Sequence, residues 1–474
     1  MHRGEVQYLA VSQSFLIFGR PPLFVGLLAL LYSTGGAGIQ TLRIFTGILG
    51  VTAVVTLWWF ARRAGGRALG LLAALLLAIY PGAVTYSRIG FSYNLLAPLI
   101  LLAAWGMWEY LETSKRRWLA LSAVMIAIGG LSDLMMFNLI PPLLLVVLAR
   151  RWRDLLWSLP LLALPFALYV GFMLVTAPAA FLFDVGFTFG RIGKLNLIEQ
   201  VGGLLVNITR LLTTDPWAAP AVVGIFLLQP LRLRRLAILL LLVPLVTLGR
   251  TVALSGVSYY YIIGLLPFIA LGMAGLVRYG TPHITRTIQD GWTALLQHFE
   301  RLFRRQRWLR TRLIAFGTMA VIFLLVVTPF MMQTLFMMNG LRSGLSTPVD
   351  NLLIKPDSAR AAAVYINEHI RDGESVIASP AVGWLFNAHV VDFQMMLAYD
   401  GITTVHLPGD LPHARFVFSP RYTDARFVVM DNIWTEWAVL NLPPALDAMM
   451  DDVEHNWALV FEVPEIRVYE NPAE

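Results

Sequence analysis

Apolar stretches separated by short clusters of arginine and lysine fill the first 335 residues, and this alternation constrains the fold most strongly. The chain is 57% hydrophobic and only 14% charged, whereas soluble domains carry about 25% charged residues. A transmembrane helix needs about 20 mostly apolar residues, and stretches near that length recur here. The pattern predicts a mostly α, polytopic membrane protein with about ten spans.

The expected spans are 42–61, 68–86, 94–111, two short spans within 118–148, 155–175, 216–228, 236–254, 259–277 and 313–332. Residues 23–32 are too short to span and are expected in the interface. Residues 177–215 form a long non-spanning segment. The basic segment 278–312 has apolar residues at helical spacing, which favours an amphipathic helix on the membrane surface, with a plain basic loop as the alternative.

The basic clusters fix the expected orientation. They lie at 62–67, 115–117, 150–153, 232–235 and 278–312, and all five fall on one side of the predicted spans. Lysine and arginine are enriched on the cytoplasmic side of membrane proteins. Residues 1–41, the loops near Arg88, 177–215 and 255–258, and the C-terminal region are therefore expected outside. The net charge of +7 reflects this topology, so membrane lipids and not nucleic acid are the expected partners.

Cysteine is absent, which excludes disulfides, thiolate nucleophiles and Cys-based metal sites. No cleavable signal peptide is visible in residues 1–20. We expect an integral membrane protein of a bacterial plasma membrane.

The composition changes after residue 335, which suggests a linker at 336–350 and an extracytoplasmic α/β domain at 351–474. Asp357 or Ser358 is expected to cap a helix that runs to Arg371. Strands are expected at 375–378, 415–418, 426–430, 458–463 and 466–469, and a helix at 434–450.

Charged residues on the outer side are the place to look for chemistry, because charges at the bilayer edge are costly unless solvated or paired. These candidates are Glu5, Arg20, Arg88, Asp133, Asp184, Arg191, Lys194, Glu199, Arg210, Asp215 and Arg250. Tyrosine and tryptophan residues lie between them. Cations would hold a phosphate, aromatic rings would stack on sugars and apolar helices would take a lipid tail. The structural alternative is that these cations only mark the headgroup level.

Several motifs carry a family resemblance. Gly4-Glu5 is followed by Tyr8, and Arg20-Pro21-Pro22-Leu23 comes before the first full span. Further motifs are Thr41-Leu42-Arg43, Arg62-Arg63, Tyr86-Ser87-Arg88, Tyr259-Tyr260-Tyr261 and Leu265-Leu266-Pro267. In their order and topology they resemble GT-C glycosyltransferases of the protein O-mannosyltransferase and lipid A aminoarabinose-transferase type, over most of residues 4–335.

The resemblance implies an enzyme that moves a hexosyl or pentosyl group from a polyprenyl-phosphate donor to an acceptor hydroxyl outside the membrane. The acceptor would be a protein, a lipid or a glycan. Glu5 matches the catalytic base, and Arg20 and Tyr8 match substrate contacts. Arg88, Arg191, Lys194 and Arg250 are phosphate candidates by position only. Tyr259 and Tyr260 are substrate candidates for which packing or a place in the interface belt is the favoured alternative.

The sequence also departs from the family pattern. Gly4 replaces one acid of the usual pair, Tyr93-Asn94 stands where many relatives carry an acid, and the loop from Glu5 to Arg20 is short. In the family a transmembrane helix precedes the acidic motif, so we expect this chain to lack that first span. Reduced, altered or lost activity is therefore a second expectation. Asp133 would then only satisfy an interrupted helix backbone.

Three alternatives stay open. His389, Asp392, His406, Asp410 and His413 match no clear metal motif, so the sequence assigns no cofactor and leaves a divalent metal open. The protein could be a non-catalytic relative that binds an envelope glycan or protein through residues 351–474. A transporter is disfavoured, because the charges lie away from the membrane midplane and no inverted repeat is apparent.

Overall fold

The computed structural model describes residues 21–36, 39–88, 90, 92–192, 197–228, 231–250, 259–281, 286–287, 307–343, 354–403, 409, 411–416, 418–432, 434 and 444–472. The described residues form two units. The helical unit comprises residues 20–172 and 194–336, and the sheet unit comprises residues 173–193 and 337–474.

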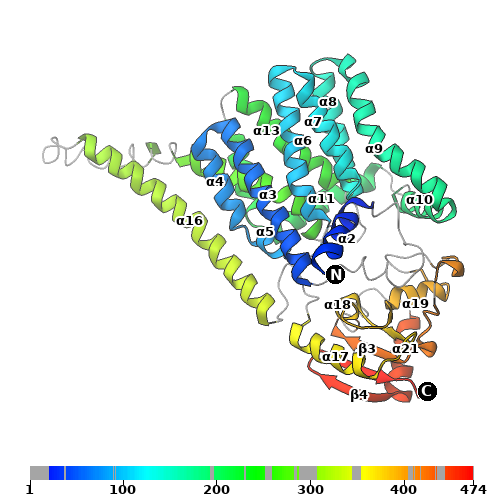
Figure 1. Cartoon of the computed structure of the whole chain (residues 1–474). Helices are drawn as coiled ribbons and strands as arrows, with labels where there is room; N and C mark the ends of the chain where they lie inside the picture. The colour runs from blue at the N-terminus through cyan, green and yellow to red at the C-terminus, as the bar shows by residue number, and fades with distance from the viewer. Residues whose placement is uncertain are drawn as a thin grey trace. The chain divides into compact units, whose positions relative to one another are not determined.

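Helices account for all the regular structure in the described part of the helical unit (Figure 1). In chain order they are α2 (Leu23–Gly35), α3 (Ile39–Gly65), α4 (Arg67–Ala78), α5 (Pro81–Tyr86), α6 (Tyr93–Thr113), α7 (Arg116–Gly130), η1 (Leu134–Leu139), α8 (Ile140–Leu148), η2 (Trp152–Asp154), α9 (Leu155–Thr176), α11 (Leu197–Thr214), α12 (Ala218–Phe226), α13 (Leu231–Arg250), η3 (Tyr259–Leu265), α14 (Leu266–Gly275), η4 (Leu276–Gly280) and α16 (Arg307–Ser343). The last turns of α9 and α16 belong to the sheet unit.

Five stretches of described helix are long and apolar enough to cross a membrane: Gln40–Gly65, Tyr93–Thr113, Trp152–Thr176, Ile262–Gly280 and Phe316–Asn339. Shorter apolar helices cover Leu23–Gly35, Arg67–Ala78, Leu134–Leu148, Val201–Thr213 and Arg235–Leu248. The predicted polytopic helical fold is confirmed. The region 118–148 breaks at Leu131–Asp133, as the sequence indicated, because α7 ends at Gly130 and η1 begins at Leu134.

Glycine lets neighbouring helices approach closely. A side chain at Gly224 of α12 would overlap the carbonyl oxygen of Gly272 in α14, and one at Gly272 would overlap that of Ala221. At Gly106 of α6 a side chain would collide with Trp118 and Ser122 of α7. Small residues at such crossings are how helices pack in lipid, where apolar burial drives association weakly.

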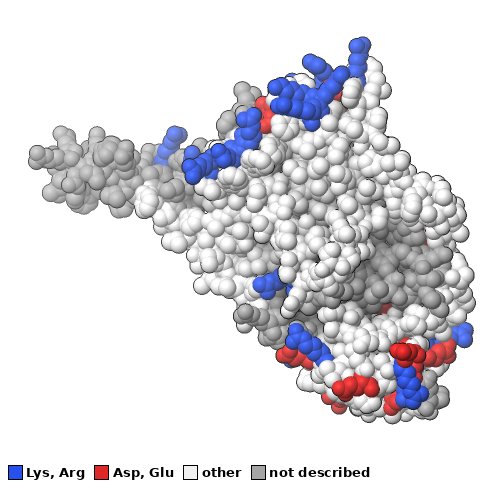
Figure 2. Space-filling view, viewed as in Figure 1, with Lys and Arg blue, Asp and Glu red and all other residues white. Residues whose placement is uncertain are grey.

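The basic clusters lie at one end of the helical unit, which we call the basic end. Arg63 Nε contacts Glu109 Oε1 at 2.8 Å, Arg116 Nε contacts Asp154 Oδ1 at 2.8 Å, and Arg235 Nη1 lies 3.8 Å from Glu112 Oε1. Tyr279, next to Arg278, lies beside Gly65. Described members of all five predicted clusters therefore lie at this end, where Figure 2 shows Lys and Arg side chains gathered.

The sheet unit is a three-layer α/β structure. Its strands are β1 (Ser375–Ile377), β2 (His389–Val391), β3 (Phe427–Asp431), β4 (Ala458–Val463) and β5 (Ile466–Glu470), in the order β2-β1-β3-β5-β4. The first three are parallel, and β5 is antiparallel to both β3 and β4. Its helices are α10 (Pro178–Ile192), α17 (Pro356–His369), α18 (Pro380–Gly383), α19 (Phe393–Tyr399) and α21 (Pro444–Asn456), with η6 (His413–Arg415) and η7 (Tyr422–Asp424).

Two hydrophobic cores cover the two faces of this sheet. On one face α17 packs through Ala362 and Ile366 against Val376 and Val429. On the other face α19 and α21 pack through residues such as Met396 and Leu446. Alternate residues of a strand point to opposite faces, so the continuous apolar run of β3 supplies both cores.

Some local expectations for this region were wrong. Residues 415–418 do not form a strand in their described part, where Arg415 ends the short helix η6. The strand β2 was missed, because three residues give no readable alternation. Helix α17 begins at Pro356, with Lys355 in the N-cap position and no side-chain cap, so neither Asp357 nor Ser358 caps it.

Candidate functional site

The end of the helical unit opposite the basic end carries most of the described polar candidates, and we call it the polar end. Helix α4 starts at Arg67 in a basic cluster and leads to Tyr80. Helix α7 starts at Arg116 and leads to Asp133. Both helices run away from the basic end, so Tyr80 and Asp133 lie at the polar end.

The Arg-Pro-Pro-Leu motif is anchored at the polar end. Pro21 is buried, Pro22 is the N-cap of α2, and the Leu23 N–H donates a 2.8 Å hydrogen bond to the Leu131 carbonyl. The two prolines precede the helix, as their fixed φ angles and missing N–H groups predict. The described half of the motif thus lies against the turn that leads to Asp133. Arg20 itself lies outside the described residues.

Asp133 accepts a backbone hydrogen bond at the break between α7 and η1. Its Oδ1 accepts a 2.9 Å hydrogen bond from the Met135 N–H and so caps η1. The Ser92 hydroxyl donates to Oδ2 at 3.4 Å. This is the structural role considered for Asp133 from the sequence.

Two predicted substrate-binding groups share a neighbourhood. Helix α5, which ends just before the exposed Arg88, contacts η3, which begins with Tyr259 and Tyr260. The Asn94 amide donates a 2.9 Å hydrogen bond to the Tyr86 carbonyl and ties the end of α5 to α6. Arg88 is therefore carried on a braced turn. The side chains of Tyr259 and Tyr260 lie outside the described atoms.

The remaining predicted site residues are not brought together by described contacts. Glu5, Tyr8 and Lys194 lie outside the described residues. Arg191 belongs to α10 and Arg250 ends α13, and their side chains are not described. The proposed catalytic constellation therefore stays a prediction.

A buried polar network, which the sequence only hinted at, crosses the polar end. The Tyr80 hydroxyl donates a 2.5 Å hydrogen bond to Asp215 Oδ2, and the Trp217 N–H donates to Oδ1 at 3.1 Å. Trp217 Nε1 donates to Gln333 Oε1 at 3.1 Å, and its ring packs on Phe330. Asp215 was a candidate charge, whereas nothing in the sequence marked Tyr80. Both are buried, and the network connects the helices that meet at this end.

The histidine and aspartate candidates in the sheet unit do not assemble a metal site in its described part. His389 stacks on Phe418 with ring centroids 4.4 Å apart, and His413 stacks on Tyr399 at 4.0 Å. Asp392 caps α19 by accepting from the Gln394 N–H. No group of three or more metal-ligating side chains occurs among the described residues, and His406 and Asp410 lie outside them.

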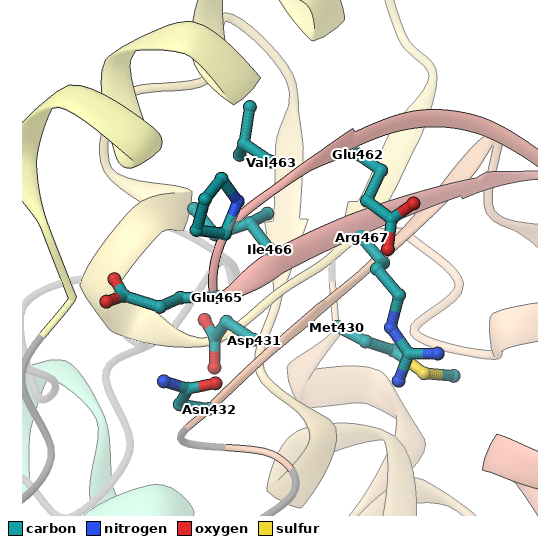
Figure 3. A pocket seen from close by; sticks show the side chains of 9 residues that line it. Met430, Asp431, Asn432, Glu462, Val463, Glu465, Ile466 and Arg467 are labelled. Carbon is teal, nitrogen blue, oxygen red and sulfur yellow. The ribbon is translucent and has the colours of Figure 1, made fainter.

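The sheet unit contains a pocket of about 440 Å³ at the carboxyl edge of its parallel strands. Its lining residues are Met430, Asp431, Asn432, Glu462, Val463, Pro464, Glu465, Ile466 and Arg467, and Figure 3 shows Asp431, Asn432 and Glu465 near one another. Ser379, after β1, donates its hydroxyl proton to Asp431 at the end of β3. The chain passes from β1 to β2 and then back across β1 to β3.

Glu465 closes this pocket in an unusual backbone conformation. It occupies the turn between β4 and β5 with a φ of 77°, a region that L-residues seldom adopt. Its carboxylate accepts the Lys355 N–H at 3.0 Å and pairs with Lys355 Nζ at 3.2 Å. The turn is thereby fastened to the start of α17.

Comparisons with known proteins agree with this architecture. Residues 19–181 of the 474 match the family model of dolichyl-phosphate-mannose-protein mannosyltransferase. A search of curated proteins found no match. The crystal structure of ArnT from Cupriavidus metallidurans bound to undecaprenyl phosphate matches with a TM-score of 0.58 and 14% identity, over 99% of this chain and 94% of that chain. The apo structure of the same enzyme matches with a TM-score of 0.53 and 15% identity, over 99% and 93%.

A likeness at this level of identity defines the fold. It agrees with the predicted resemblance and with the five helices that are long and apolar enough to span a membrane. The chain is an integral membrane protein with a GT-C-like fold similar to that of ArnT, and its residues 19–181 match the mannosyltransferase family model.

Proposed function

We propose that this protein is a glycosyltransferase that moves a sugar from a polyprenyl-phosphate donor to an acceptor hydroxyl on the outer face of a bacterial plasma membrane. One observation carries the proposal: essentially the whole chain has the fold of ArnT, and that enzyme was crystallised with undecaprenyl phosphate. The family match over residues 19–181 supports the same class of donor. The acceptor is a protein, a lipid or a glycan, and the sugar is a hexose or a pentose.

In the proposed reaction Glu5 takes the proton of the acceptor hydroxyl, and the oxygen attacks the anomeric carbon of the sugar. The bond from that carbon to the phosphate breaks, and polyprenyl phosphate leaves with the electron pair. Arg20 and further cations, such as Arg88, stabilise the negative charge that grows on the phosphate.

Two features of the polar end support these roles. The hydrogen bond from Leu23 to Leu131 anchors the Pro21–Leu23 half of the second motif at the polar end. Arg88 is exposed on a turn braced by the Asn94 amide, and it has no acidic partner within 4.0 Å among the described side chains. A guanidinium in this position is available to a phosphate.

The test uses full-length protein in lipid nanodiscs with a panel of sugar-labelled polyprenyl-phosphate donors and measures the release of polyprenyl phosphate. Glu5→Gln and Arg20→Ala are each expected to abolish release, while insertion and the unfolding midpoint stay unchanged. Glu368→Gln and Arg360→Ala, at exposed positions of α17, are matched controls and should retain activity. A double variant, Glu5→Gln with Arg20→Ala, that keeps full activity would disprove the proposal.

A second candidate function follows from the pocket in the sheet unit. In this reading the protein is a non-catalytic relative that binds an envelope glycan or a protein partner through residues 351–474. The pocket between the end of β3 and the β4–β5 turn, with its carboxylate and amide groups, favours it, because such groups hydrogen-bond to hydroxyls. It would be preferred if the full-length protein bound no donor lipid but bound soluble oligosaccharides, and Asn432→Ala removed that binding.

A further inference from the structure

A concentrated positive charge lies at the basic end, where two segments of the chain meet. Residues 115–117 and 150–154 contain six cations, namely Lys115, Arg116, Arg117, Arg150, Arg151 and Arg153, and one carboxylate, Asp154. Arg116 Nε contacts Asp154 Oδ1 at 2.8 Å, and Arg150 donates to the Leu111 carbonyl. The two segments therefore form one surface, which we call the arginine surface.

The one carboxylate of this surface cannot neutralise it. Asp154 is 1% exposed, and its two oxygens accept hydrogen bonds from Arg116 and from the Tyr110 hydroxyl, each at 2.8 Å. The nearest acids in sequence, Glu109 and Glu112, pair with Arg63 and Arg235. Most of the six positive charges thus lack a described acidic partner and attract an anion from outside.

The arginine surface lies at the ends of two candidate membrane spans. The candidate span Tyr93–Thr113 ends beside it, and the candidate span Trp152–Thr176 begins within it. Trp152 and Trp157 are each 61% exposed, and tryptophan concentrates at the membrane–water boundary. Arg153 lies over the ring of Trp152 at 5.8 Å, and Arg116 lies over Trp157 at 5.5 Å. A stacked guanidinium keeps the N–H groups at its edge available for a phosphate.

An apolar surface continues from the arginine surface along α9. Leu156 is 70% exposed, and Leu159, Leu164 and Leu168 are also exposed further along the helix. A cationic site that leads directly into an exposed apolar stripe matches a molecule with a phosphate headgroup and acyl chains. Free phosphate would use only the first part.

We propose that the arginine surface and the exposed stripe of α9 form a binding site for an anionic phospholipid, with its headgroup phosphate among Arg116, Arg117 and Arg153. The site lies at the opposite end of the helical unit from Arg88, so it is separate from the proposed donor site and does not depend on the proposed function. Bound lipid stabilises the junction of α7 and α9, because the headgroup bridges cations from both segments.

The test measures phospholipid retained by the full-length protein in detergent, by native mass spectrometry, together with the thermal unfolding midpoint. Wild-type protein is titrated with phosphatidylglycerol, phosphatidylcholine or inorganic phosphate. Phosphatidylglycerol should bind more tightly and raise the midpoint more than phosphatidylcholine, and the difference should shrink at high salt. Arg117→Gln with Arg153→Gln leaves the Arg116–Asp154 pair intact and should weaken phosphatidylglycerol binding on the order of tenfold.

Two further double variants serve as controls. The first keeps the positive charge at the site but removes the guanidinium groups, and the second lowers the net charge of the protein away from the site. Arg117→Lys with Arg153→Lys keeps the charge and should retain most of the binding. Arg360→Gln with Arg371→Gln removes the same charge from the sheet unit and should leave binding unchanged. Equal retention of the two lipids by wild type, or full phosphatidylglycerol binding by the glutamine variant, would overturn the proposal. The proposal would also be overturned if inorganic phosphate raised the unfolding midpoint as much as phosphatidylglycerol does.

Discussion

Tyr80 donates a 2.5 Å hydrogen bond to the Asp215 carboxylate, although 135 residues separate them in sequence. Tyr80 is 1% exposed and Asp215 2% exposed. The same carboxylate accepts the Trp217 N–H at the start of α12, and Trp217 holds Gln333 of α16. One buried acid thus connects three segments that meet at the polar end.

Asp215→Ala is expected to destabilise the protein more than Tyr80→Phe. The alanine leaves the Tyr80 hydroxyl and the Trp217 N–H without this acceptor, at roughly 1–3 kcal/mol for each buried group, whereas Tyr80→Phe loses one bond worth about 1–2 kcal/mol. Equilibrium unfolding in mixed micelles measures both losses. The double variant should be less destabilised than the sum of the single variants, and simple additivity would contradict the pairing.

The crossing of α12 and α14 gives a prediction about packing. Gly224→Val should prevent correct folding, because its side chain would overlap the Gly272 carbonyl in the facing backbone, which cannot move aside. Gly47→Ala in α3 is the control, since its side chain would meet nothing within 4 Å. Alanine there should be neutral or stabilise by up to about 1 kcal/mol. The yield of monodisperse protein in size-exclusion chromatography distinguishes the two, and a well-folded Gly224→Val variant would show that the crossing is wrong.

These relationships show how far the sequence could lead. The apolar stretches and basic clusters predicted the helices and the segregation of Arg63, Arg116 and Arg235 to one end, because both depend only on local composition. The partner of Asp215 could not be predicted, because it depends on which helices are neighbours. The strand His389–Val391 was missed for a similar reason: a three-residue strand is stabilised by its pairing with β1 more than by its own sequence pattern.

The proposed roles of Glu5 and Arg20 stay predictions for a different reason. They rest on motif resemblance, and the described contacts reach only the Pro21–Leu23 half of the second motif. Asp133 illustrates the opposite case. Its sequence context allowed either chemistry or a structural role, and the hydrogen bond from the Met135 N–H identifies a cap.

The ion pair between Arg116 and Asp154 is expected to matter far more than an exposed pair of the same type. Asp154→Ala removes the carboxylate that accepts hydrogen bonds from the Tyr110 hydroxyl and from Arg116. Because Asp154 is 1% exposed, the loss should cost roughly 1–3 kcal/mol of unfolding free energy, mainly through the unpaired Tyr110 hydroxyl. Asp357→Ala breaks the ion pair with Arg360. The Arg360 side chain is 70% exposed and that of Asp357 is 96% exposed, so the free energy of unfolding should change by less than about 0.5 kcal/mol. Unfolding in mixed micelles compares them, and equal losses would contradict the buried geometry.

Arg88→Gln tests whether Arg88 contacts the donor phosphate or contributes only to the stability of the fold. The Arg88 side chain is exposed on the turn after α5, so its loss should shift the unfolding free energy by less than about 0.5 kcal/mol. If Arg88 contacts the donor phosphate, losing that charged hydrogen bond, worth about 1.5–3 kcal/mol, should lower kcat/KM for donor-lipid consumption by roughly 10- to 100-fold. Arg67→Gln is the matched control, because Arg67 is an equally exposed arginine at the basic end, and its turnover should match wild type. If both variants lost activity to the same extent, the effect would come from net charge, and Arg88 would not be a donor contact.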